Sequence, residues 1–201
     1  MTPLTTPART AGGRAPGSPA RGPVPGDLVR VGALVSVLGA AVASDGVAVA
    51  LFALVLGGTV VPRATAAPPA LDVASGVVTL AAAWCAVAGL YERVEGLDLL
   101  VHGVATGVLA ALAHHVLRRR DGAARLLRTR RAAAATTVAA GALLAVVWEL
   151  LEVLGHTLVD DTIYVTPADT AGDLAAGLVG SVAAAWCVAR RHPRTPAEAR
   201  A

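Results

Sequence analysis

The second half of the chain carries acidic and imidazole side chains at helical spacing inside otherwise apolar segments. They form three groups, which are Asp98 with His102, Glu149 with Glu152 and His156, and Asp169 with Asp173. Residues three, four or seven positions apart share one face of a helix, so each group is expected to form a stripe. An ionised carboxylate at the centre of a membrane costs about 2.5–3.5 kcal/mol by insertion scales, and less near the interface. These side chains therefore need partners.

We expect the three stripes to converge and form one metal site. Several carboxylates packed at low dielectric must take up protons or share a cation. Mixed carboxylate and imidazole ligands suit Mn, Fe, Zn or Mg better than Cu(I). The predicted ligands are His102, Glu149, Glu152 and Asp173, and the predicted supporting residues around them are Asp98, Asp169 and His156. The alternative is a network of protonated carboxyl groups that joins the helices by hydrogen bonds.

The segments that carry these groups are long enough to cross a membrane. The chain has 201 residues, of which 55% are hydrophobic and 15% charged, whereas soluble domains have about a quarter charged residues. Five ranges are almost uncharged, namely 28–61, 70–91, 97–117, 132–155 and 168–189. A spanning helix needs about 20 residues, and only helices satisfy the backbone of such segments in lipid. The sequence predicts an all-α, polytopic transmembrane helical bundle and excludes a soluble fold for this part.

The number of helices depends on the range 28–61. As one helix it would be about 50 Å long, whereas the hydrocarbon core of a bilayer is about 30 Å thick. Ser44-Asp45-Gly46 supplies turn residues at its midpoint, so two short helices at 28–44 and 46–61 are predicted. The bundle then has six helices over 28–190, between a disordered cytoplasmic tail at 1–27 and a second tail at 191–201. A cleaved signal peptide around 31–43 is the alternative for the first helix.

The arginines predict the orientation of this bundle. All seventeen basic residues are arginine, and with six spans and a cytoplasmic amino terminus every one except Arg93 falls inside. This distribution follows the positive-inside rule and predicts that both termini lie in the cytoplasm. We interpret the basic loop at 118–131 as a topology signal beside an anionic leaflet, and expect no nucleic-acid partner. Asp72 fits an acid in the first turn of its helix, which the helix dipole favours.

Small residues predict which helices meet. Two stripes at four-residue spacing occur, Gly103-Gly107-Ala111 and Gly172-Ala176-Gly180-Ala184. Such stripes let lipid-embedded helices pack backbone to backbone. Both run beside acidic faces, so the last three helices are expected to bring the predicted ligands together.

The order of these motifs resembles a known family. The motifs are Asp98-x-x-x-His102, then Trp148-Glu149-x-x-Glu152, then Asp169-Thr170-x-x-Asp173 with Gly180 beyond. Over about residues 88–185 the chain resembles the VanZ-like superfamily of small bacterial membrane proteins, and looks closest to a sister group of uncharacterised inner-membrane proteins. The resemblance implies a polar site near the outer helix ends, without a settled reaction.

Three functions remain open from the sequence. The first is an envelope protein whose outward-facing, metal-binding site acts on a lipid-linked or other anionic substrate. The second is a proton- or cation-coupled transporter that uses the same carboxylates as a relay. It would need a polar path, for which the inner halves of the last three helices offer only Thr106, Thr136, Thr137 and Ser181. The third is a structural membrane-assembly protein. Whether the protein is an enzyme is left open.

Overall fold

The prediction of an all-α bundle is confirmed. The computed structural model describes residues 22–43, 45–123 and 127–191, and no strand occurs among them. The helices are α1 (Gly26–Val42), α2 (Gly46–Gly58), α3 (Val60–Ala64), α4 (Pro69–Val87), α5 (Leu97–Arg118), α6 (Arg130–Leu158) and α7 (Pro167–Arg191). The predicted tails at 1–27 and 191–201 lie mostly outside the described residues. The first helix begins at Gly26, two residues before the predicted start of the bundle.

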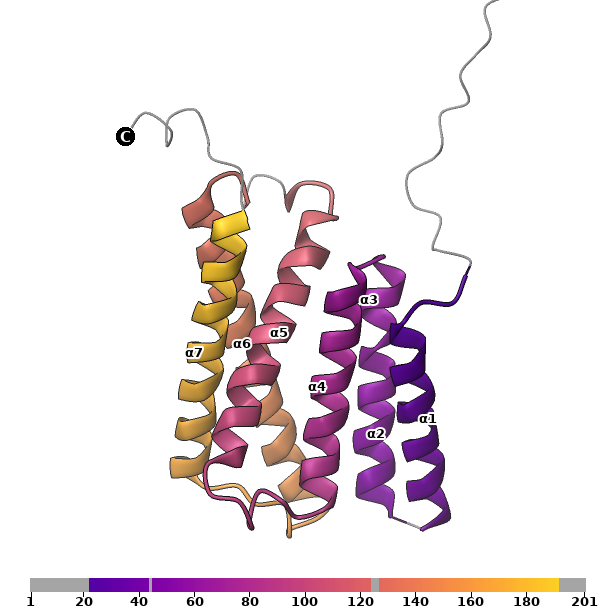
Figure 1. Cartoon of the computed structure of the whole chain (residues 1–201). Coiled ribbons are helices and arrows are strands. Elements are labelled where there is room, and N and C mark those ends of the chain that lie inside the picture. The colour runs from indigo at the N-terminus through magenta and orange to yellow at the C-terminus, as the bar shows by residue number, and fades with distance from the viewer. Residues whose placement is uncertain (1–21, 44, 124–126, 192–201) are drawn as a thin grey trace, which may run out of the picture.

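Six rods lie side by side, because α2 and α3 together form one nearly continuous helix over Gly46–Ala64 (Figure 1). The predicted break before this rod is present, and Asp45 is its N-cap, with a side-chain oxygen that accepts a hydrogen bond from the amide of Ala48 at 2.9 Å. Five rods are long and apolar enough to cross a membrane by length and composition. With 17 residues, α1 is at the lower limit of a spanning helix, and it runs alongside α2.

The rods form two units of three helices. In the first unit α1, α2 and α4 pack against one another, and in the second α5, α6 and α7 do. Contact between α4 and α5 joins the units. The first unit has a core of apolar side chains, in which Phe52 contacts Trp84 with ring centroids 5.0 Å apart. The Trp84 indole N–H also donates to Ser36 Oγ at 3.1 Å, which links α4 to α1.

The predicted close approach of α5 and α7 is confirmed. A Cβ atom added to Gly103 would lie 3.3 Å from the carbonyl oxygen of Ala176, and one on Gly107 would lie 2.8 Å from that of Gly180. A Cβ atom on Gly180 would overlap the carbonyl oxygen of Gly103. Only glycine permits this backbone contact, which fixes α7 against α5 two turns from the acidic residue Asp173.

The two ends of the bundle differ in charge. The first residue of α1 and the last of α7 lie at the same end as the connections at 65–68 and after α5 (Figure 1). This end, called the basic end below, carries Arg30, Arg63, Arg118 and Arg191. The opposite end, called the acidic end, has the connections 88–96 and 159–166, and it contains the predicted ligands.

Candidate functional site

His102 lies at the centre of a polar cluster at the acidic end. Its Nδ1 atom is 2.7 Å from Asp173 Oδ1 on α7 and 3.4 Å from Asp98 Oδ1, one turn earlier on α5. The Asp173 side chain is only 3% exposed. The two atoms form a buried ion pair when the imidazole carries a proton on Nδ1, although their geometry is not that of a well-aligned hydrogen bond. A bound cation in place of that proton would offset the charge of Asp173 in the same way.

Two glutamates of α6 reach the same imidazole. One ligand atom from each of His102, Glu149 and Glu152 lies within 4.8 Å of the other two, and Glu149 is buried. The indole N–H of Trp148 faces Glu152 but is buried without a well-aligned hydrogen bond. The structure therefore contains two groups that share His102, one with Asp98 and Asp173 and the other with Glu149 and Glu152.

The cluster is rich in carboxylates and poor in positive charge. Within the described ranges no arginine nitrogen lies within 4.0 Å of its carboxylate oxygens, and the ion pairs there involve His102 alone. Acids that share a site of low dielectric cannot all ionise unless a cation or several protons offset their charge. The chemistry of these donors, one imidazole and several carboxylates, matches the ligands of Mn, Fe, Zn and Mg.

Two predicted supporting residues lie outside both groups. Asp169 is in the first turn of α7, where its amide N–H donates to Thr166 Oγ1 at 3.2 Å. His156 shares the helix face of Glu149 but lies about 10 Å further along the axis, since seven residues separate them. Its Nδ1 atom is 2.7 Å from the carbonyl oxygen of Ile163 and so ties the end of α6 to the connection with α7. Of the three predicted supporting residues, only Asp98 contacts the imidazole.

A cavity that the sequence analysis missed ends at this cluster. It has a volume of about 360 Å³ and lies between the two units, lined by residues of α2, α4, α5 and α6. His102, Glu152, Trp148 and Tyr91 line it at the acidic end. Tyr91 lies in the connection 88–96, and its hydroxyl donates to the carbonyl oxygen of Ala82 at 3.0 Å. Burial raises the pKa of this phenol, so it remains protonated and keeps that hydrogen bond.

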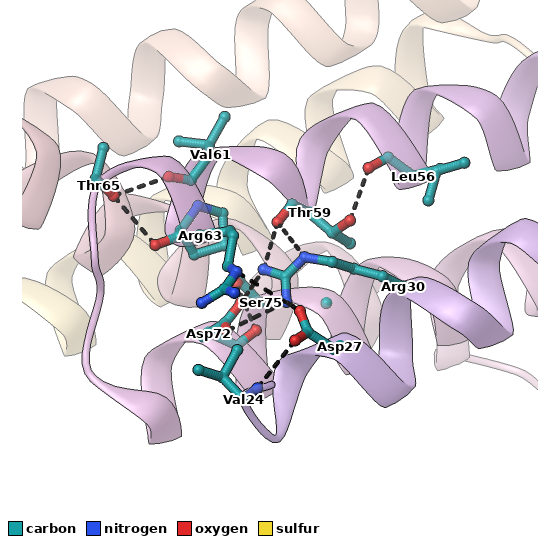
Figure 2. Close-up of polar contacts among 12 residues, drawn as sticks. Val24, Asp27, Arg30, Leu56, Thr59, Val61, Arg63, Thr65, Asp72 and Ser75 are labelled. Carbon is teal, nitrogen blue, oxygen red and sulfur yellow. Dashed lines mark hydrogen bonds and ion pairs between the residues drawn. The ribbon is translucent and has the colours of Figure 1, made fainter. Parts of the chain in front are cut away.

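The sequence analysis also missed the partner of Asp72. Figure 2 shows Asp72 of α4 beside the guanidinium of Arg30 on α1, with a distance of 2.6 Å between Arg30 Nη2 and Asp72 Oδ1. Arg30 also donates to Asp27 at 3.0 Å and to the carbonyl oxygen of Thr59 at 2.6 Å. Asp72 is therefore one half of a buried ion pair at the basic end, which goes beyond the helix-dipole interpretation. The sequence did contain a signal for this pair, because Arg30 lies inside an otherwise apolar segment and so needs an acidic partner.

Comparison with known families places the chain among membrane proteins. A family model described as "Predicted membrane protein (DUF2238)" matches residues 28–194, which include every candidate site residue. No curated protein is significantly similar to the chain. No solved structure is significantly similar to it either.

Proposed function

The chain belongs to the DUF2238 family of predicted membrane proteins, and we propose that its acidic end binds a divalent metal ion. The cluster around His102 carries this proposal, because Asp173 is only 3% exposed, its Oδ1 lies 2.7 Å from His102 Nδ1, and the ion pairs of the cluster among the described residues involve His102 alone. We further propose that the family is related to the VanZ-like superfamily, on the strength of the three ordered motifs.

The proposed ligands are His102, Glu149, Glu152 and Asp173. A divalent ion offsets the mutual repulsion of their carboxylates, which protonation would otherwise have to remove. Asp98 Oδ1 lies 3.4 Å from the same Nδ1 atom, so its charge favours a proton or a cation beside the imidazole. A metal here would activate water or polarise a phosphoryl or acyl oxygen. This chemistry fits action on a lipid-linked or other anionic envelope substrate.

Elemental analysis of the purified protein tests the metal. We expect a stoichiometric divalent ion in the wild type and its loss in the double variant Glu149→Gln, Asp173→Asn, which keeps side-chain size while removing two charged ligands. Asp98→Asn is expected to weaken binding about 10–100-fold, as for other groups that contact a metal ligand. Asp161→Asn, an exposed acid at the same end, is the matched control and should leave binding unchanged. A wild-type protein that takes up no Mn, Fe, Zn or Mg, and whose melting temperature ignores chelators, would refute the proposal.

Coupled transport has less support. The cavity beside the cluster is lined mainly by alkyl side chains, such as Leu109 and Leu144, which offer an ion no ligands. Ion flux through proteoliposomes that is abolished by Glu149→Gln would reverse this ranking. A purely structural protein would instead tolerate neutralisation of each acid singly.

We propose that the acidic end faces out of the cell and that both termini are cytoplasmic, in a bacterial inner membrane. The test uses single cysteines in a background that lacks Cys85 and Cys187. A membrane-impermeant maleimide added to intact cells is expected to label Thr162→Cys, in the connection between α6 and α7, and to leave Asp121→Cys unlabelled. Asp121→Cys, at the basic end, should react with the maleimide only after the membrane is permeabilised. The reverse pattern would show that the site faces the cytoplasm.

A further inference from the structure

We infer that the cavity between the two units binds the hydrocarbon chain of a lipid phosphate, with the phosphate at the cluster around His102. This inference rests on the proposed metal site for the head group. It adds a binding site for the chain, to which α2 and α4, the helices without a proposed metal ligand, contribute part of the wall.

The polarity of the cavity changes along its length. Polar residues gather at the acidic end, where His102, Glu152 and Tyr91 line it. Further in, its wall consists of alkyl side chains such as Leu109 and Leu112. From His102 to Leu112 the cavity follows α5 for about 15 Å, which is about half the thickness of a hydrocarbon core. A ligand that fits this pattern has a polar head and an apolar chain of several carbon atoms.

Three of the four hydroxyl groups of Thr and Ser side chains that line the cavity, all except that of Thr106, donate within their own helices. Thr59 Oγ1 donates to the carbonyl oxygen of Leu56 at 2.7 Å, and Thr79 Oγ1 donates to that of Ser75 at 2.8 Å. Ser75 Oγ in turn donates to the carbonyl oxygen of Asp72 at 3.1 Å. Because these donors are satisfied within their own helices, the inner part behaves as an apolar cavity, and such cavities stay dry and take up apolar ligands. The volume of about 360 Å³ is within the range of about 300–1,000 Å³ found for ligand sites.

The cavity has a side on which a chain can enter from the bilayer. The helices α2 and α6 both line it, yet they are not one of the closely packed helix pairs. Leu54 on α2 is 52% exposed, and Leu151 on α6 is 45% exposed. Both side chains also line the cavity, so the proposed route for the chain of a bilayer amphiphile runs between α2 and α6, with its head at the membrane surface.

The head group follows from the donors at the cluster. The Trp148 N–H faces Glu152 and so holds this carboxylate at the cavity wall, beside His102. A divalent ion held by carboxylates binds and polarises phosphoryl oxygens. Without that ion the carboxylates would repel a phosphate, which explains why the head group requires the metal while the chain does not.

Photolabelling tests the chain site. The probe is dodecyl phosphate with a diazirine in its chain, added to the full chain in phosphatidylcholine nanodiscs, with adducts mapped by mass spectrometry. We expect adducts on cavity residues such as Val55, Leu109 and Leu144, and their suppression by excess unlabelled dodecyl phosphate. Ala82→Leu, which fills the cavity, should lower this labelling about tenfold, since an overpacked site excludes the chain. Ala81→Leu is the matched control, because Ala81 is exposed on the same helix outside the cavity, and it should change nothing.

The outcomes separate the two proposals. Adducts confined to lipid-facing residues such as Leu143 and Val179, or adducts that unlabelled probe fails to suppress in the wild type, would overturn the inference. Metal binding without labelling of the cavity would refute the proposed chain site and leave the proposed metal site standing. Labelling of the cavity in a protein that takes up no metal would retain the chain site and reject both the metal and the phosphate assigned to it.

Discussion

Arg30→Met is expected to lower the free energy of unfolding by about 3–5 kcal/mol, since it leaves a buried carboxylate without its partner. The Asp72 side chain is 6% exposed and lies 2.6 Å from the guanidinium. The same substitution removes both donors from the carbonyl oxygen of Thr59, where α2 ends. Three helices of the first unit would thus lose one shared connection. Unfolding in detergent, followed by the fluorescence of Trp84, measures the effect.

The companion variants show whether the loss comes from the pair. The double variant Arg30→Met, Asp72→Leu is expected to recover much of the stability, because an apolar pair can replace a buried ion pair at little cost. Arg63→Met is the control, since Arg63 is 28% exposed and 3.7 Å from Asp27, and such partly exposed pairs contribute about 1 kcal/mol or less. If Arg63→Met proved as damaging as Arg30→Met, the ion pair with Asp72 would not be what holds this unit together.

Gly180→Ala is expected to destabilise the second unit by about 3 kcal/mol, the upper end for an overpacked core. Its methyl group would overlap the carbonyl oxygen of Gly103, and backbone cannot move aside as a side chain can. The helices α5 and α7 would have to separate, and this also displaces Asp173 from His102, the residue next to Gly103. Thermal unfolding and metal content, measured on the same preparation, should therefore both fall.

The control for this prediction is Gly57→Ala on α2. An added Cβ atom there meets nothing within 4 Å, so the variant is expected to gain about 0.5–1 kcal/mol from the helix propensity of alanine. Comparable stability of both alanine variants would show that α5 and α7 do not depend on backbone contact at Gly180.

Periodic features were predicted well from the sequence. A helix places residues four apart on one face, so the pairing of Asp98 with His102 and the glycine stripe of α7 transfer directly from sequence to structure. The break before α2 was likewise predicted from local turn residues, although the cap that Asp45 forms there was not. His156 shows the limit of this reasoning. Its spacing from Glu149 predicts the correct helix face, but seven residues of axial rise place it about 10 Å away. There it contacts the carbonyl oxygen of Ile163, a contact that the spacing does not predict.

Features that depend on distant parts of the chain were not predictable. Arg30 and Asp72 are 42 residues apart, and nothing in their local sequences specifies how α1 and α4 are rotated toward each other. The cavity is even less predictable from the sequence, because it forms where α2 and α6 do not pack closely and is lined by residues of four helices. The contact of Asp173 with Nδ1 of His102 also depends on side-chain rotamers, which spacing leaves undetermined.

The division of the bundle into two units places the proposed metal ligands and part of the cavity wall on different helices. All four proposed ligands come from α5 and α6 and α7, whereas α2 and α4 form part of the cavity wall and carry none of them. Substitutions in the first unit therefore alter the length and width of the cavity while the ligand side chains stay in place. The proposed chain site and the proposed metal site can therefore be altered independently of each other by substitution.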